Sequence, residues 1–278
     1  MREHIAFTGF WKLYVGRALL TLPSHLVGIF LPIFLFVTFN AQLWPVFVYY
    51  LLGHFAYALC VPLGARFLNG AGYPRTLVLG TLFNTLFFCS LLVAHSAGTP
   101  FHVLLAVGCS LVALVCFRLF FWLPYHVEVA ALTNGAHRGL AISLILSMVT
   151  LATVIGPAFG GFIIDAYGYG VVFFVVACAS LLAYVPFRLV PSPHQRFEWS
   201  YRETWRKFMA PEYRGMTKAM FAHGVENVVG AVAWPLFMFL LLDGSVLEVG
   251  MLSSLIVAAT IVLQLLAGKH LDRIRGPG

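Results

Sequence analysis

The feature that most constrains this chain is a series of apolar runs, each about 20 residues or longer, that together occupy most of its length. A helix needs about 20 residues, at 1.5 Å per residue, to cross a hydrocarbon core of roughly 30 Å. The runs do not alternate polar and apolar residues as the strands of a membrane barrel do. We therefore predict an all-α fold, a polytopic membrane helical bundle. Its eight spans are predicted at residues 13–38, 43–65, 75–95, 101–124, 139–164, 170–188, 217–242 and 247–268.

Composition agrees with a membrane protein and argues against other classes. Hydrophobic residues make up 61% of the chain and charged residues 10%, whereas soluble domains are about one quarter charged. The net charge of +7 does not indicate nucleic-acid binding, because basic residues in such proteins gather in cytoplasmic loops. The five cysteines lie within apolar runs and form no CxxC pair or metal-ligand spacing. We expect no metal, no cofactor and no nucleic-acid partner.

The loops divide sharply by charge. Those after spans one, three, five and seven contain no Lys or Arg. By the positive-inside rule, the N-terminus, residues 188–216 and the C-terminus are therefore predicted to be cytoplasmic, in a plasma or inner membrane. The first run is too long for a cleaved secretory signal, so we expect it to remain as a span. The other loops carry the basic residues: Arg66, Arg75, Arg138, the set from Arg188 to Lys218, Lys269, Arg273 and Arg275.

The segment from Arg188 to Lys218 is the only long polar stretch, and it holds seven of the seventeen Lys and Arg residues. It divides the chain into a six-helix bundle at 1–187, a cytoplasmic linker at 188–216 and a two-helix part at 217–278. Aromatic residues such as Trp199 and Trp205 alternate with basic ones such as Arg202. This pattern suits a short helix lying in the headgroup region. A charged loop that only fixes topology is the alternative.

Glu226 is the clearest ionisable residue at membrane depth. It lies about nine residues into the seventh span, roughly 13 Å along a helix, and such residues usually face a cavity or a partner. His223, Asn227 and Gly230 fall at helical spacing on much the same face. The group is a candidate protonatable or solute-contacting site. The alternative is a carboxyl group that binds a neighbouring helix for structure.

Three further polar residues lie within spans. His25 and His54 can titrate near physiological pH, which would suit proton coupling, or each can be satisfied by a single interhelical hydrogen bond. Arg118 lies in the fourth span, toward the cytoplasmic side. It can extend its charge to the interface, pair with an acid such as Glu128, or bind an anionic solute.

A small-residue motif, Gly156-Pro157-Ala158-Phe159-Gly160-Gly161, lies in the fifth span. Glycines four residues apart allow a neighbouring backbone to approach closely, and Pro157 removes a helical hydrogen bond and bends the rod. This motif resembles the Gly-Pro-x-x-Gly-Gly signature of the major facilitator superfamily of secondary transporters. The family's preceding glycines are replaced here by Ala152 and Ser143, which are also small. In the family the signature is associated with antiporters.

Two loops resemble the same family. The loop after span two has Gly64, Asn69, Gly72 and Arg75 where the family has a Gly, Asp-Arg and Gly pattern that forms a charged clasp controlling opening. Asn69 replaces the Asp one position late, so we expect a weakened clasp. The loop after span eight keeps more of the pattern, in Gly268, Asp272 and Arg273. Related loops after spans two and eight are the internal repeat expected of two six-helix halves.

The resemblance implies a secondary transporter of a small solute that works by alternating access in a lipid bilayer. Protons are a possible coupling ion, with a lean toward antiport. Complete members have twelve spans, of which eight are visible here, so we expect a fragment; a reduced protein is the alternative. A sensor or assembly protein without transport also remains open. No HExxH, paired-acid or Ser/His set is present, so an intramembrane enzyme is not expected.

Overall fold

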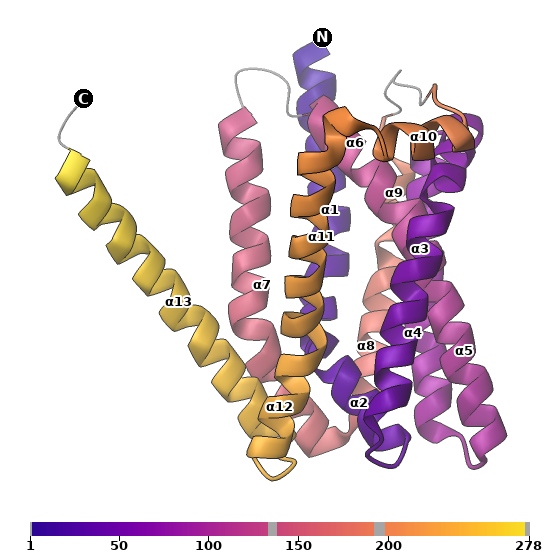
Figure 1. The fold of residues 1–278 in the computed structure, drawn as a ribbon, viewed down its shortest axis with the longest axis vertical. Coiled ribbons are helices and arrows are strands. Elements are labelled where there is room, and N and C mark those ends of the chain that lie inside the picture. The colour runs from indigo at the N-terminus through magenta and orange to yellow at the C-terminus, as the bar shows by residue number, and fades with distance from the viewer. Residues whose placement is uncertain (1, 133–137, 192–197, 276–278) are drawn as a thin grey trace.

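The protein is a bundle of long helices, with no strand among the residues that the structure describes. A computed structural model describes residues 2–132, 138–191 and 198–275, and side chains from 9 to 267 except 128, 130–138 and 192–197. Seven of the described helices are long and apolar enough to cross a membrane, and a bent pair makes an eighth span when counted as one. This confirms the predicted all-α membrane bundle. Figure 1 shows most of these helices running side by side.

The first four predicted spans correspond to seven helical segments. The first span consists of two helices with axes 48° apart, and the fourth is interrupted by a π-helical turn. The segments are α1 (Arg2–Val27), α2 (Phe30–Thr38), α3 (Leu43–Ala71), α4 (Tyr73–Ser96), α5 (Pro100–Phe117), the π-helix η1 (Arg118–Trp122) and α6 (Leu123–Leu132).

The rest of the chain supplies four further spans and a short helix that is not a span. The seventh span, like the fourth, contains a π-helical turn. The segments are α7 (Arg138–Tyr167), α8 (Tyr169–Leu182), α9 (Tyr184–Arg188), α10 (Tyr201–Phe208), the 3₁₀ turn η2 (Pro211–Tyr213), α11 (Arg214–Val228), the π-helix η3 (Val229–Ala233), α12 (Trp234–Leu241) and α13 (Val246–Arg275).

Several helices are longer than the apolar runs that predicted them. α3 continues to Ala71, six residues beyond the predicted end, because polar residues such as Arg66 and Asn69 can extend a helix into water. The helix ends at Gly72, whose φ of +82° is readily adopted only by glycine. α4 then begins at once with Tyr73 and Pro74. Arg66, Arg75 and Arg188 lie at the end of the bundle that also holds the N-terminus, and we call this the basic end.

Two apolar clusters form the interior. The larger one surrounds Phe30, Phe34 and Phe173 and joins α2 to α3, α4, α5 and α8. The smaller one surrounds Leu13, Phe121 and Phe187, nearer the basic end. Buried polar pairs connect helices within this interior: the hydroxyls of Tyr49 and Ser110 lie 3.0 Å apart, and the Asn84 amide donates to Ser180 Oγ at 2.8 Å.

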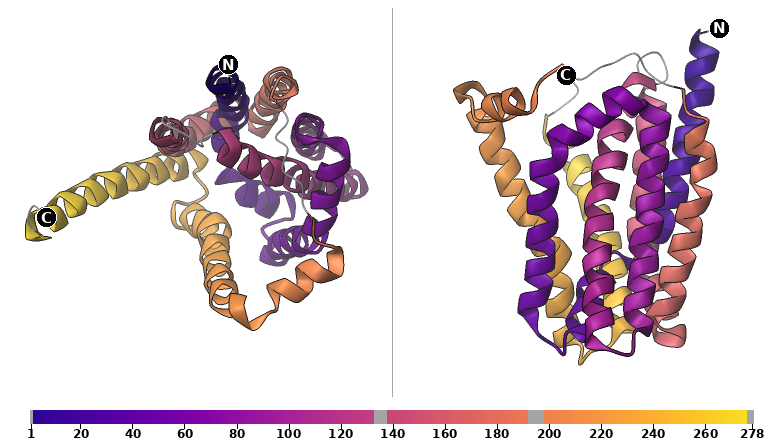
Figure 2. Two further views of the ribbon diagram at one scale, coloured as in Figure 1. Left: turned by 90° about the horizontal axis from the view of Figure 1, so that it is seen from above. Right: turned by 90° about the vertical axis from the view of Figure 1, so that its right-hand side faces the viewer.

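Helices of the second part of the chain contact the first part unevenly. α13 crosses α7 in close contact near its own start and then diverges from the bundle (Figure 1), and α12 contacts α2, while α11 has no buried residue. α10 lies across the basic end and leads to α11, as the view from above in Figure 2 shows. The Tyr201 hydroxyl of α10 donates to the Leu59 carbonyl of α3 at 3.3 Å. A short helix therefore occupies part of the polar middle segment.

Candidate functional site

Among the described residues, the first, fourth, sixth and seventh spans each contain a break. In the sixth it is the single residue Ala183, between α8 and α9; the breaks in the other three spans each have a polar residue beside them. The first span bends between Val27 and Phe30, three residues after His25. In the fourth and seventh spans, π-helical turns occupy residues 118–122 and 229–233. Pro124 lies two residues after the turn in the fourth span, and Pro235 lies two residues after the turn in the seventh. A proline has no N–H to give to the preceding turn, so the helix is loosened at this point.

His25 lies in α1 where α1 crosses α7. Its Nδ1 is 2.8 Å from the carbonyl oxygen of Thr21 in the same helix, so one ring nitrogen is already satisfied. A Cβ placed on Gly156 would lie 2.6 Å from the Cβ of His25. The close approach of α7 therefore depends on glycine at this position.

Arg17, two turns before His25, was not among the residues predicted from the sequence, yet it is one of the most distinctive side chains in the bundle. Its guanidinium carbon lies 4.4 Å from the centre of the Trp122 ring and 5.1 Å from that of Tyr125. Such distances are typical of cation–π contacts. Among the described residues, Arg17 Nε and Thr21 Oγ1 are buried without a hydrogen-bond partner. A basic residue within an apolar run was the signal that could have identified it.

Arg118 is the first residue of η1 and is partly buried. The hydroxyls of Tyr49, Tyr50 and Tyr57, all in α3, lie near its guanidinium group. The ion pairs formed by described side chains join Lys207 to Glu203 and His223 to Glu226, so neither Arg17 nor Arg118 takes part in one. The side chain of Glu128, a predicted partner for Arg118, lies outside the described residues.

In the seventh span, Glu226 and His223 form a pair. The Glu226 carboxylate lies 3.4 Å from Nδ1 of His223, and the two side chains are 82% and 66% exposed. Asn227 is exposed beside them. Glu226 and His223 therefore lie on one helix face, as predicted. Among the described residues, no helix of the first six spans covers this face.

His54 lies apart from the broken spans. It is an exposed residue of α3, its Nδ1 is 2.7 Å from the Tyr50 carbonyl oxygen, and its ring stacks on that of Tyr50. These local contacts satisfy the side chain within its own helix.

The Gly-Pro motif brings three helices into backbone contact. A Cβ on Gly160 would clash with the backbone of Leu26 in α1, and one on Gly161 would lie 2.9 Å from the Val246 carbonyl of α13. Across the same crossing, Ser254 Oγ accepts a hydrogen bond from the Ala158 N–H at 2.9 Å. The motif therefore allows α7 to pack between α1 and α13 with almost no separation.

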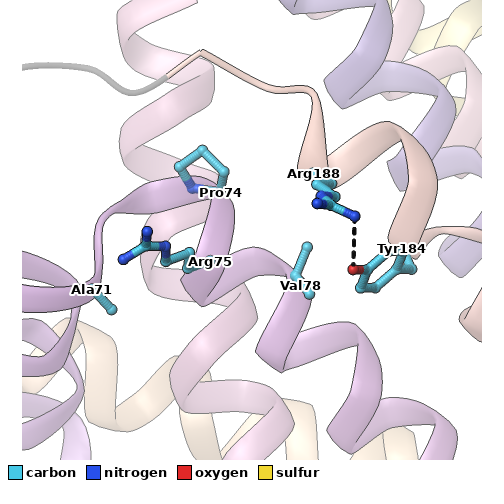
Figure 3. A pocket seen from close by; sticks show the side chains of 6 residues that line it. All are labelled: Ala71, Pro74, Arg75, Val78, Tyr184 and Arg188. Carbon is cyan, nitrogen blue, oxygen red and sulfur yellow. Dashed lines mark hydrogen bonds between the residues drawn. The ribbon is translucent and has the colours of Figure 1, made fainter.

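The loop residues predicted to control opening have different surroundings. Gly64 faces Leu119, with a hypothetical Cβ 3.5 Å from that side chain, and Asn69 is exposed at the end of α3. Arg75 lines a pocket at the basic end (Figure 3). Gly268, Asp272 and Arg273 belong to the last part of α13, where the helix is described but the side chains lie outside the described residues.

Comparison with curated proteins gives no match. The model of the Major Facilitator Superfamily, by contrast, matches residues 13–277 of the 278. Members of this family are typically transporters rather than enzymes. With its all-helical bundle and its glycine-mediated crossings of long apolar helices, this chain belongs to the major facilitator superfamily, as a membrane protein of several spans.

Proposed function

We propose that this protein is a secondary active transporter that moves a small anionic solute by alternating access, coupled to protons. The observation that carries the anionic assignment is the pair Arg17 and Arg118. Both are basic residues within spans, and neither has a carboxylate partner among the described side chains. A charge at membrane depth is costly unless it is paired. A bound anion would provide a counter-charge for these residues.

The arrangement of the breaks supports a site between the first, fourth and seventh spans. In transporters of this family each half is built from two inverted three-span units, so these spans each begin a unit. Interrupted helices at corresponding positions are typical of substrate sites, because broken backbone is tolerated where it lines a cavity. His25, Arg118 and Glu226 each lie at or within three residues of such a break.

Glu226 and His223 support the proton-coupling part of the proposal. The Glu226 carboxylate lies 3.4 Å from Nδ1 of His223, so a proton held by one group can pass directly to the other. We further propose the orientation that the loop charges indicate, with the N-terminus and residues 188–216 in the cytoplasm. The six-helix bundle at 1–187, the linker and the part at 217–278 are proposed as the units that move.

The experiment is solute binding by the purified chain, followed by intrinsic tryptophan fluorescence. Trp122 stacks on Arg17, so an anion at this position should change its emission. The probes are succinate, citrate and glycerol 3-phosphate, each compared with glycerol and putrescine. We expect a saturable response to at least one anion and none to glycerol or putrescine, and we expect Arg17→Met to abolish it.

Two results would overturn the anionic assignment: a response to putrescine alone, or an anion response that Arg17→Met leaves unchanged. Flux in proteoliposomes then tests transport itself. Binding of an anion without flux would reject the transporter and favour a sensor, which is the alternative that the sequence left open.

A further inference from the structure

We propose that a pocket at the basic end, between the start of α4 and α9, binds the phosphate headgroup of an anionic phospholipid. The pocket has a volume of about 560 Å³ and is lined by Ala71, Pro74, Arg75, Val78, Tyr184 and Arg188. Figure 3 shows the first turns of α4 on one side and Tyr184 and Arg188 on the other. None of these residues belongs to the solute site proposed above, so this inference does not depend on that function.

The lining is cationic. Arg75 and Arg188 are both exposed, and neither is in an ion pair with a described side chain. None of the described residues that line the pocket is acidic. Arg188 Nη1 donates to the Tyr184 hydroxyl at 3.4 Å, which leaves other N–H groups of the guanidinium for a ligand. Guanidinium groups bind phosphate through paired, charge-assisted hydrogen bonds.

The start of α4 adds to this positive potential. The helix begins at Tyr73, and its first turn contains no acidic residue. The helix dipole places partial positive charge at this end of α4, which favours an anion. The first turn of α4 and the two arginines therefore act on the same pocket from two separate elements.

The surroundings favour a lipid as the source of the phosphate. Leu82 follows Val78 by one turn of α4 and lies on the same face, and Leu181 lies in α8 shortly before Tyr184; both are farther from the basic end than the pocket residues. Leu82 and Leu181 are 42% and 52% exposed. A ligand with a phosphate in the pocket could lay its acyl chains along these apolar side chains. Basic pockets between helix ends are a known type of site for anionic headgroups.

The test is native mass spectrometry of the purified chain in neutral detergent, with phosphatidylglycerol or phosphatidylcholine of identical acyl chains. The pocket variant is Arg75→Gln with Arg188→Gln. The matched control is Arg66→Gln with Arg202→Gln, which removes two exposed charges elsewhere in the chain. We expect the pocket variant to weaken phosphatidylglycerol binding by about tenfold or more, since each lost charge-assisted hydrogen bond is expensive, and the control to change it less than twofold.

A second variant keeps both charges and fills the space. Val78→Phe should also weaken phosphatidylglycerol binding, and its thermal unfolding shows whether the bundle is intact. Competition with inorganic phosphate distinguishes the source of the ligand. Retained phosphatidylglycerol binding with phosphate present supports a lipid site, whereas full displacement by millimolar phosphate assigns the pocket to a free anion and overturns the lipid. Equal binding of phosphatidylcholine, or an equal loss in the control variant, would also overturn the proposal.

Discussion

The guanidinium carbon of Arg17 lies 4.4 Å from the centre of the Trp122 ring, which joins the first span to the fourth at its π-helical turn. The contact stabilises the charge, but a cation–π interaction contributes only ~0.5–2 kcal/mol. No carboxylate among the described side chains pairs with Arg17, and burial of an ion without a partner costs several kcal/mol. Stabilisation of the fold therefore does not account for the presence of a charged side chain at position 17.

The first prediction concerns Arg17→Met. Because the buried charge costs more than its aromatic contacts return, we expect this variant to unfold at the same temperature as the parent or a higher one. Binding of the anion identified by fluorescence should fall at least about tenfold, the effect of losing a charged hydrogen bond. Unfolding is measured by scanning fluorimetry. Glu128→Gln is the companion variant. If Glu128→Gln and Arg17→Met both lower the unfolding temperature by a similar large amount, the Arg17 and Glu128 side chains pair with each other, and the prediction is wrong.

A second prediction concerns the crossing of α1 and α7. Gly160→Ala places a methyl group against the backbone of Leu26, which cannot move aside as a flexible side chain would. We expect a loss of ~1–3 kcal/mol in stability, the usual cost of overpacking. Gly108→Ala, in α5, is the control because a Cβ there meets nothing within 4 Å. Equal unfolding temperatures for the two variants would contradict the close packing.

The third prediction concerns proton coupling. Glu226→Gln keeps the shape of the side chain but cannot take up a proton. In proteoliposomes containing a pH-sensitive dye, we expect solute addition to acidify or alkalinise the lumen for the parent and not for this variant. Downhill solute exchange should continue. Glu248→Gln, an exposed acid at the start of α13, should behave like the parent. A proton signal that persists in Glu226→Gln would assign coupling to another group.

The fourth prediction concerns orientation. In a chain whose five cysteines are replaced, Gly98→Cys should react with a membrane-impermeant maleimide added to intact cells. Met209→Cys, which follows α10 and is 72% exposed as methionine, should react only after permeabilisation. The opposite pattern would invert the proposed topology.

The sequence predicted the spans well because hydropathy measures how apolar a segment is, and a helix that crosses the membrane must be apolar over about 20 residues. It predicted less well where helices end, since α3 continues past Arg66 to a glycine that hydropathy does not register. The bend after Val27 and the two π-helical turns were not predicted either. A proline indicates a loosened helix, but whether the chain kinks, bulges or stays straight depends on its neighbours, such as the contact between Gly80 and Phe121.

Part of the geometry of the candidate site was predictable, whereas its role stays a prediction. The spacing of His223 and Glu226 placed them on one helix face, and they are a pair in the structure. Arg17 was missed because it was counted as part of an apolar run, and its partners Trp122 and Tyr125 lie more than 100 residues away in the chain. Contacts between distant spans leave no periodic trace in a single sequence. The roles of His25, His54 and Arg118 remain predictions.

The crossing of α7 and α13 has a mechanical consequence. At Gly161 and Gly250 the two backbones touch, and a Cβ on Gly161 would lie 3.3 Å from the Cα of Gly250. Side chains elsewhere in the bundle can change rotamer and so accommodate a small displacement of a neighbouring helix. Two backbones in direct contact cannot adjust in this way. A sideways displacement of α13 at this crossing is therefore passed directly to α7, whereas α13 can rotate about the contact, which lies beside the Ala158–Ser254 hydrogen bond.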